Sequence, residues 1–538
     1  MADMDIDQPA LDLPLIAAAA SEFSNYPGDI SDASAESFLS KFPLPVLLSA
    51  LETGRDVPGL ESSVALSLER IFQTAYGKKL LPQTLSYAGV GLKAESSLVR
   101  KLTCSAIGDL LEGGETDGGA AVRAIAEAHL AAPLLLAIGD GDAHVAKAAA
   151  DALGKLARNP GGLELIFTAK GAGAGLLKDM ASQSSATVRI RALSMAASIF
   201  GISEEAAAAV QDSGIFTVLA AELDNSDDML AQLNALELLC DLAATSHGAK
   251  FLLAGNLIGR LTSTICNLAL DSLVRSRAMT VAARLIPLYD ESPGSPLSVR
   301  EASGIVHAFG ELLKHLEELN DKGQTTETTE YENALNALSF IAKTVKGAEL
   351  LFDHTMVIRH MVKAAFLDRT LCIKLAGLQV LATVAGSERD PSNVLLSESS
   401  EAQLKDMIYS AAEERSPTRT PAGMFLIFFQ QSTEVRLAMY RFTSPMLARL
   451  WCLRELCASR EVVDYLLDAR LEISKDSMEW RHVCCVAMTT ALSAAIERGQ
   501  IPPTDTLSRL EEFVRKGPFL GKEQQKEAIP IYATLERM

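Results

Sequence analysis

The chain has 538 residues, of which 48% are hydrophobic but only 5% aromatic, and its formal net charge at pH 7 is −19. This length exceeds what one compact core usually supports, and the abundance of Ala and Leu favours closely packed helices over β-sheets. The excess of acidic residues, without any dense Lys/Arg run, disfavours nucleic acid as a partner because phosphate binding requires clustered cations.

Residues 1–35 are predicted to form a partly disordered segment, and no membrane association is expected. The opening stretch MADMDIDQPALDLPL has no basic region before its apolar residues, unlike a secretory signal, and later apolar runs are too short or too charged to span a bilayer. The eight cysteines lie mostly at apolar helical positions without paired CxxC spacing, which indicates reduced, buried thiols. We expect a location in the cytoplasm, with the nucleus as a second compartment.

A helical stripe of four apolar residues recurs in the sequence at a fixed interval, as from Val145 to Val188. Within each copy, spacings of four, four and three place the residues on one helix face. Every position in four copies is apolar: Val145, Ala149, Leu153 and Leu156; Val188, Ala192, Ala196 and Ile199; Ala231, Ala235, Leu239 and Leu242; Val274, Ala278, Ala282 and Leu285. The four copies share one register and have turns at matching positions. Both features together indicate a structural repeat, because chance apolar matches in an Ala-rich chain would not reproduce the turns as well.

The residues that follow each apolar stripe predict where its helix ends and the next helix of the repeat begins. Asn159–Gly162 and Ser246–Gly248 break the helix, and a short apolar helix follows, as at 163–167. Two or three helices in about 43 residues are typical of armadillo and HEAT arrays, in which stacked neighbours bury the stripe that one repeat leaves exposed. We predict an all-α, armadillo/HEAT-like, right-handed superhelical solenoid that occupies residues 36–538 as a single array, clearest over 139–290.

The repeat continues less regularly on both sides of its central part, with comparable stripes beginning at Val99, Ile373 and Val435. Hydrophilic stretches between the predicted helices are expected to be loops. These loops lie near residues 113–119, 291–296, 320–333, 387–401 and 413–421.

No catalytic, cofactor-binding or metal-binding residues are predicted. The glycine-rich stretch at 170–175 follows no predicted strand and lacks the Gly-Lys-Ser/Thr ending of a phosphate-binding loop, so a turn between helices is the preferred interpretation. The eight histidines form no HExxH pattern, and GxSxG is absent. The sequence therefore indicates a protein that is not an enzyme and needs no cofactor or metal.

Two columns of polar residues follow the repeat and are the candidate partner-binding site. In armadillo-type arrays the last helix of each repeat lines a concave groove, so polar positions one repeat apart form ladders. The columns are Asp151, Ser194, Glu237 and Thr280, and then Lys155, Ser198, Asp241 and Arg284. A solvated helix face that binds nothing is the alternative. The acidic and mixed character favours a protein partner with basic patches over nucleic acid.

Several segments resemble the family of 26S proteasome non-ATPase regulatory subunit 5. They are spread from about residue 60 to about residue 525 and keep the order of the family's elements. The matching segments are HVAKAA at 144–149, GLELIF at 162–167, SHGAKFL at 246–252, DSMEWR at 476–481 and GPF at 517–519. The insertions at 320–333 and 387–401 and the divergent N-terminus depart from the family's pattern.

The resemblance implies a chaperone for assembly of the 26S proteasome regulatory-particle base. Members of this family bind the C-terminal domain of one base AAA-ATPase through the concave surface and associate with base assembly intermediates. They block premature docking of the ATPase onto the 20S core and leave before the holoenzyme is complete. No membrane or nucleic-acid partner is expected, and the free protein is expected to be a monomer.

Two other interpretations stay open on the sequence alone. One is a generic armadillo-type adaptor or scaffold unrelated to the proteasome; nuclear import receptors of this type are disfavoured because their Trp-Asn ladders are missing, with Trp only at 451 and 480. The other is an enzyme built on a helical array, for which no catalytic residue is apparent.

Overall fold

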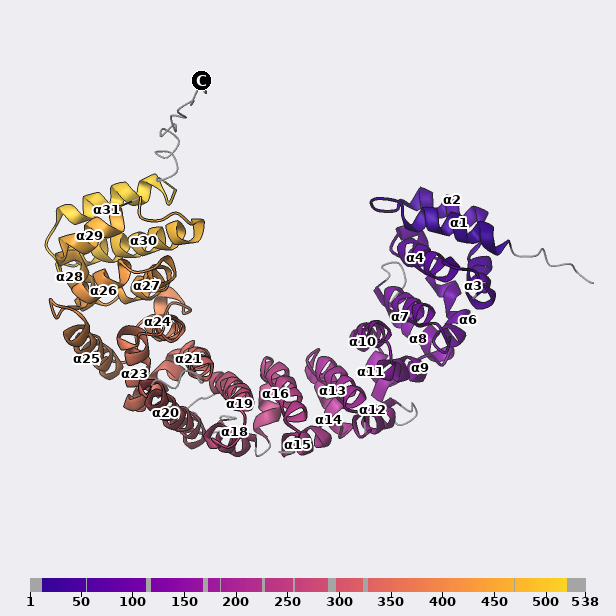
Figure 1. The fold of residues 1–538 in the computed structure, drawn as a ribbon, viewed down its shortest axis with the longest axis horizontal. Coiled ribbons are helices and arrows are strands. Elements are labelled where there is room, and N and C mark those ends of the chain that lie inside the picture. Colours follow the sequence, from indigo (N-terminus) through magenta and orange to yellow (C-terminus); the bar gives the residue numbers. More distant parts are fainter. Residues whose placement is uncertain are drawn as a thin grey trace, which may run out of the picture. The chain divides into compact units, whose positions relative to one another are not determined.

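Figure 1 shows the computed structural model, in which the regular secondary structure is helical and the described residues include no β-strand. The chain divides into two compact units, Met1–Gly248 and Ala249–Met538. The predicted all-α, helical-repeat class is confirmed. The described residues are 12–54, 56–112, 118–167, 173–183, 185–224, 228–254, 257–288, 297–322, 328–468 and 470–519.

The first unit is built from short helices joined by tight turns. They are α1 (Leu13–Ser24), α2 (Asp32–Lys41), α3 (Leu44–Thr53), α4 (Leu60–Phe72), α5 (Ala75–Lys78), α6 (Leu81–Gly91), α7 (Ser97–Glu112), α8 (Gly118–Glu127), α9 (Ala131–Leu136), the 3₁₀ turn η1 (Ala137–Gly139), α10 (Ala143–Arg158), α11 (Gly162–Phe167), α12 (Gly173–Ala181), α13 (Ala186–Phe200), α14 (Glu204–Asp212), α15 (Phe216–Asp224), α16 (Met229–Ala243) and α17 (Ser246–Leu253), which crosses into the second unit.

The second unit contains longer helices and one π-helical turn. Its elements are α18 (Leu257–Cys266), α19 (Ser272–Leu285), η2 (Ile286–Leu288), α20 (Val299–Asp321), α21 (Thr328–Ala342), α22 (Val345–Asp353), α23 (Thr355–Val362), the π-helix η4 (Lys363–Leu367), α24 (Leu371–Ala385), η5 (Pro391–Asn393), α25 (Glu398–Arg415), α26 (Pro421–Phe429), α27 (Thr433–Met446), α28 (Leu450–Ala458), α29 (Arg460–Leu467), α30 (Lys475–Glu497) and α31 (Asp505–Lys516).

One helix of each repeat forms a row along the concave edge of the first unit (Figure 1). The row consists of α4, α7, α10, α13 and α16, and each of these helices packs against the next. The helices α9, α12, α14 and α15 lie on the opposite edge of the unit. In the second unit α19, α21, α24, α27 and α30 form a row of successive contacts in the same way. Residues one repeat apart within a unit therefore lie on adjacent helices.

The apolar stripe predicted from the repeat is the buried face of α10, α13, α16 and α19. Fifteen of its sixteen residues are at most 7% exposed, and Val188 alone is half-buried. Most of these side chains are Ala, Val, Ile or Leu, so neighbouring helices approach closely without large side chains between them. The prediction of a repeated core face is confirmed.

A recurring turn explains why a short helix follows the stripe helix. In Thr74–Gly77, Thr245–Gly248 and Thr344–Gly347 the threonine Oγ1 accepts the glycine N–H at 2.9, 3.2 and 3.0 Å. A Cβ on any of these glycines would overlap the carbonyl oxygen six residues earlier, at the end of the preceding helix. Asn159 and Gly162 occupy the same turn between α10 and α11. Only glycine permits this close approach.

The core of the second unit combines aromatic rings with buried ion pairs. Phe366 packs edge-to-face against Phe428 and Phe442, with ring centroids 5.4 and 5.7 Å apart. The guanidinium of Arg275 forms two hydrogen bonds of 2.6 Å with the Glu330 carboxylate, and both residues are buried. Similar ion pairs join Arg436 to Glu472 and Arg449 to Glu401, each at 2.8 Å.

The prediction of a loop at 320–333 is wrong at both of its boundaries. The helix α20 continues to Asp321 and α21 begins at Thr328, while residues 323–327 lie outside the described part of the chain. The hydrophilic sequence misled the prediction because Tyr331 and Glu330 are both 2% exposed, and Glu330 is neutralised by Arg275 on another helix. A local pattern does not reveal such a partner.

The other predicted loops are shorter than the sequence indicated or lie outside the described residues. Ser397 caps α25 by accepting the N–H of Ser400, so residues 398–401 are helical. The loop predicted at 413–421 is confined to 416–420, between α25 and α26. The predicted loop 291–296 and residues 113–117 lie outside the described part, and α8 begins at Gly118.

Candidate partner-binding groove

The eight residues of the predicted ladders lie on four helices. Asp151 and Lys155 are on α10, Ser194 and Ser198 on α13, Glu237 and Asp241 on α16, and Thr280 and Arg284 on α19. All eight reach the surface: Asp151, Ser194, Ser198, Glu237 and Asp241 are exposed and the other three are half-buried. The first six belong to the first unit, where their helices are consecutive members of one row, and the last two belong to the second unit.

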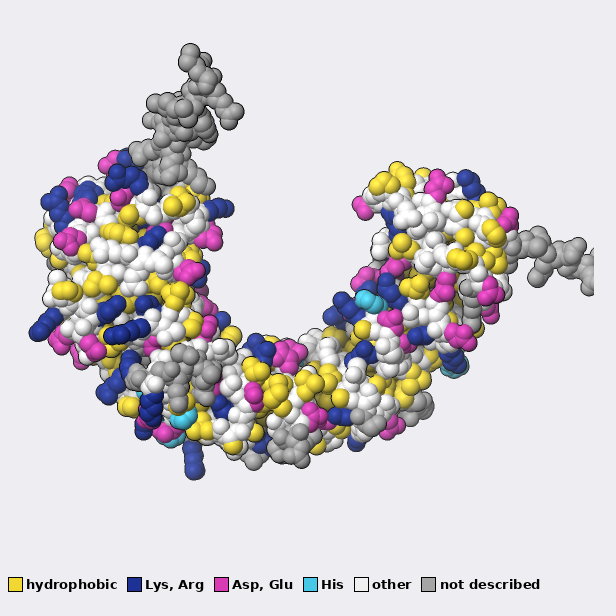
Figure 2. Space-filling model, viewed as in Figure 1, with side chains coloured by type: hydrophobic (Ala, Val, Ile, Leu, Met, Phe, Trp, Pro, Cys, Tyr) yellow, Lys and Arg dark blue, Asp and Glu magenta, His cyan; other side chains and the backbone are white. Residues whose placement is uncertain are grey.

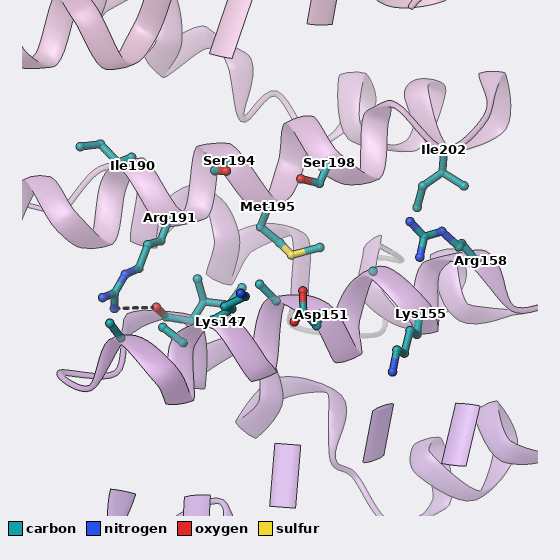
Figure 3. Close-up of a pocket in the computed structure, with 15 residues that line it drawn as sticks. Lys147, Asp151, Lys155, Arg158, Ile190, Arg191, Ser194, Met195, Ser198 and Ile202 are labelled. Carbon is teal, nitrogen blue, oxygen red and sulfur yellow. Dashed lines mark hydrogen bonds between the residues drawn. The ribbon is translucent and has the colours of Figure 1, made fainter. Parts of the chain in front are cut away.

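A groove of about 580 Å³ runs between α10 and α13, and four ladder residues line it: Asp151, Lys155, Ser194 and Ser198. The close-up in Figure 3 shows Asp151 pointing from α10 toward α13, and Met195 pointing from α13 toward α10. Met195 is 3% exposed, so the floor of the groove is apolar where the two helices meet. The structure thus places these four predicted residues around one concave feature.

The groove carries more positive than negative charge, although the whole protein is acidic. Its cationic lining residues are Lys147, Lys155, Arg158 and Arg191, and its one carboxylate is Asp151. The Lys155 ammonium faces away from α13 and lies 3.0 Å from Glu112 and 3.7 Å from Asp109 on α7. Lys155 is therefore neutralised within the molecule, and the positive potential comes from the other three cations.

The three other cations, Arg191, Lys147 and Arg158, differ in their hydrogen-bond partners and exposure. Arg191 donates from Nη1 to the carbonyl oxygens of Asp140 and Ile138, at 2.6 and 3.3 Å, and so keeps its charge beside neutral acceptors. Lys147 and Arg158 are exposed, and no ion-pair partner occurs for either among the described residues. Figure 3 shows Arg158 near Ile202 at one end of the groove and Arg191 at the other.

A second, smaller groove of about 300 Å³ continues the surface between α7 and α10. Lys147, Asp151 and Lys155 line both grooves, and His144 and Lys101 line the second one. Lys and Arg side chains gather with Asp and Glu over α7 and α10 in Figure 2. Burial raises the pKa of the Asp109 carboxyl despite the neighbouring Lys155.

The ladder residues on the second unit are engaged in contacts within their own unit. The Thr280 hydroxyl donates to the Ser276 carbonyl at 3.0 Å, and the Arg284 guanidinium lies over the Phe340 ring, 5.5 Å from its centre. Contacts within the unit are therefore enough to explain why Thr280 and Arg284 are polar. Their role in binding stays a prediction.

The sequence columns missed Lys147, Gly154, Arg158 and Arg191. Along α10, Lys147 lies one turn before Asp151 and Arg158 lies one turn after Lys155, so following the same helix face further would have found both. Arg191 precedes Ser194 by one turn on the same face of α13, and its contact with the end of η1 becomes apparent only when the two elements pack together.

The described residues bring no metal-binding cluster together, and three of their buried thiols are less acidic than a free cysteine. No group of three or more His, Cys, Asp or Glu residues among them is placed to hold a metal ion. Burial raises the pKa of the thiols of Cys104, Cys452 and Cys485 to about 12, which keeps them protonated at neutral pH. In the same part of the chain, no single helix combines the length and the apolar composition that crossing a membrane requires.

Fold and groove together define a helical-repeat protein with a groove of mixed charge between two of its helices. The chain belongs to the family described as proteasome non-ATPase 26S subunit, whose model matches residues 63–530. This confirms the resemblance detected in the sequence. Relatives named 26S proteasome non-ATPase regulatory subunit 5 are 21% identical in Bos taurus and 22% identical in both Mus musculus and Homo sapiens, and each alignment covers 82% of this chain and 81% of the relative.

Among solved structures, an engineered protein is similar over 83% of this chain and 98% of its own, with 17% identity and a TM-score of 0.41. A similarity of this size adds nothing to the assignment of the family.

Proposed function

We propose that this protein is an assembly chaperone of the 26S proteasome regulatory-particle base, and that it acts by binding and steric exclusion without catalysing a reaction. Membership of the proteasome non-ATPase subunit family over residues 63–530 is the observation that carries the proposal. The matched relatives are named as regulatory subunits and not as ATPases, which supports a role in which another protein supplies the chemistry.

In this proposal the polar row on α10, α13 and α16 contacts the C-terminal domain of one base AAA-ATPase. Five of the six ladder residues on these helices are exposed, so they are available to a partner without unfolding. The bound protein obstructs docking of the ATPase onto the 20S core and leaves before the holoenzyme is complete. It is monomeric when free and works in the cytoplasm, with the nucleus as a second compartment.

Affinity purification of the tagged full-length chain from cells, followed by mass spectrometry, tests the proposal. We expect one base ATPase and free base intermediates, with 20S core subunits far below stoichiometric amounts. Recovery of the intact holoenzyme in stoichiometric amounts would contradict a transient chaperone. Recovery of other proteins without any base ATPase would instead favour the general adaptor.

Charge reversal of Asp241 tests whether the row is the binding face. Asp241 is exposed on α16, whereas Arg284 is occupied by its contact with Phe340 and is the less informative choice. Asp241→Lys is expected to reduce capture of the ATPase by about tenfold. Asp212→Lys makes the same change at the exposed end of α14, on the other edge of the unit, and is the matched control. Equal capture by both variants would exclude Asp241 from the interface.

A further inference from the structure

We propose that the groove between α10 and α13 binds an acidic, extended segment of the partner, whose main chain passes over Gly154. This proposal rests on the proposed function for the identity of the partner and adds the chemistry that this part of the surface recognises. It differs from the expectation drawn from the ladder columns, which favoured a partner with basic patches.

Gly154 is the first observation that points to an occupant. It lies inside α10, where glycine is less favourable than alanine by about 1 kcal/mol. A Cβ at this position would meet nothing within 4 Å, so no contact within the described structure requires glycine. By contrast, the glycine at 162 is required by a close backbone approach. Because Gly154 lines the groove, its missing side chain leaves room for another molecule to come close to the helix.

Charge is the second, independent observation. Lys147 and Arg158 lie on either side of Gly154 along α10, and Arg191 faces them from α13. Asp151 is the one carboxylate in the lining, and the ammonium of Lys155 is already paired with α7. The local excess of cations favours carboxylates over a basic segment within this groove, although the protein as a whole has a net charge of −19.

The floor of the groove favours polypeptide over nucleic acid. Ile190 and Met195 from α13, Ile202 from the turn after it, and Ala146 and Ala150 from α10 present aliphatic surface between the cations. No aromatic ring on which a base would stack lines the groove. The sixteen residues of α10 span about 24 Å, which corresponds to about seven residues of extended chain. A segment that alternates acidic and aliphatic side chains matches both the floor and the rim.

Direct binding of short peptides tests the groove without any proteasome component. The probe is a fluorescein-labelled ten-residue peptide that alternates Glu and Leu, measured by fluorescence anisotropy with the full-length chain. The reference probes are the same peptide with Lys in place of Glu and a labelled twenty-residue oligo-dT. We expect the acidic peptide to bind at least tenfold more tightly than either reference, with an affinity that falls as salt is raised. No binding of the acidic peptide, or tighter binding of either reference, would overturn the proposal.

Variants of the groove then locate the site. Gly154→Trp fills the open space over α10, and the double variant Lys147→Glu with Arg158→Glu reverses the charge; each is expected to weaken binding of the acidic peptide by at least tenfold. Arg123→Glu, an exposed position on α8, is the matched control and should bind like the unmodified chain. Circular dichroism must show unchanged helicity. Full binding by the folded Gly154→Trp variant would overturn the placement over Gly154.

A photo-cross-linking residue at Ser194, which is exposed in the groove, examines the proposed partner directly. The cross-linked segment of the captured protein is expected to be rich in Asp and Glu. A basic cross-linked segment would overturn the acidic-segment proposal and leave the assembly function intact. Capture of no base ATPase by the unmodified chain would defeat the assembly function, whereas the peptide measurements would still decide whether the groove binds acidic chains.

Discussion

The two units bury their helices by different means. Among the described residues of the first unit, Phe200 is the largest fully buried side chain, and the stripe is made of small aliphatic residues. In the second unit, fully buried aromatic rings such as Phe366, Phe428 and Phe442 fill the core, together with the buried Arg275–Glu330 ion pair. Small side chains let the helices of the first unit pack closely, whereas in the second unit large aromatic rings also fill space between the helices.

The two units also differ in where their charged side chains lie. The strongest buried polar and aromatic contacts belong to the second unit, and the groove with the unpaired Lys147 and Arg158 belongs to the first. A scaffold for a partner needs charges on its surface that are not already satisfied within the molecule. In the first unit, Lys147 and Arg158 are exposed charges of this kind.

The largest expected effect comes from shortening an aromatic side chain in the second unit. Phe428→Ala removes a fully buried ring that packs against Phe366, and should lower the free energy of unfolding by about 3–5 kcal/mol because a cavity remains. Urea unfolding followed by circular dichroism measures the change. Phe519→Ala makes the same substitution at a residue 40% exposed and should change stability by less than about 0.5 kcal/mol. Equal effects would show that the rings are not what stabilises the unit.

Breaking the buried ion pair is expected to have the next largest effect. Glu330→Gln leaves the Arg275 guanidinium buried without a counter-charge and should destabilise the protein by about 3 kcal/mol, because the amide still accepts one hydrogen bond. Glu332→Gln, two residues further along α21 and half-buried, is the control. The double variant Arg275→Met with Glu330→Leu should recover most of the loss. If the double variant stays as unstable as Glu330→Gln, the Arg275–Glu330 pair also determines how the helices pack, in addition to balancing its two buried charges.

Acidification should affect an ion pair in the first unit more modestly. The Asp140 carboxylate accepts hydrogen bonds of 2.6 and 3.0 Å from Arg100, and this contact lowers the pKa of Asp140 below its ordinary value of 3.8. Its contribution is therefore complete above pH 3.8 and is lost as the pH falls through the lower, folded-state pKa. We expect about 1 kcal/mol from this partly exposed pair. In urea unfolding at several pH values, Arg100→Met should lose the part of the acid-induced decrease in stability that comes from Asp140. If the decrease is the same as in the unmodified chain, other carboxylates cause it.

The smallest effect is a gain in stability. Gly154→Ala should raise the free energy of unfolding by up to about 1 kcal/mol, because alanine favours the helix and its Cβ enters open space. Gly162→Ala should do the opposite, because its Cβ would overlap the Leu156 carbonyl oxygen. Thermal unfolding of both variants measures this contrast between Gly162, which the fold requires, and Gly154, which the fold does not require. Loss of stability in Gly154→Ala would remove the main argument for an occupant of the groove.

The sequence alone determined the helical class, the repeat and its buried face. The stripe of Val145, Ala149, Leu153 and Leu156 is local in the chain, and a period of 3.6 residues fixes which side chains share a helix face. The same logic found the polar positions of α10 and α13 that line the groove. Family membership was also legible, because the matching segments keep their order along the chain.

Only the tertiary structure decided which polar residues have partners inside the molecule. Glu330 looked like part of a loop until Arg275, 55 positions earlier, was seen to neutralise it. Lys155 and Asp151 are one helical turn apart, yet Lys155 pairs with α7 and Asp151 points toward α13. Electrostatic pairing depends on distances between helices, and a one-dimensional pattern carries no such distances.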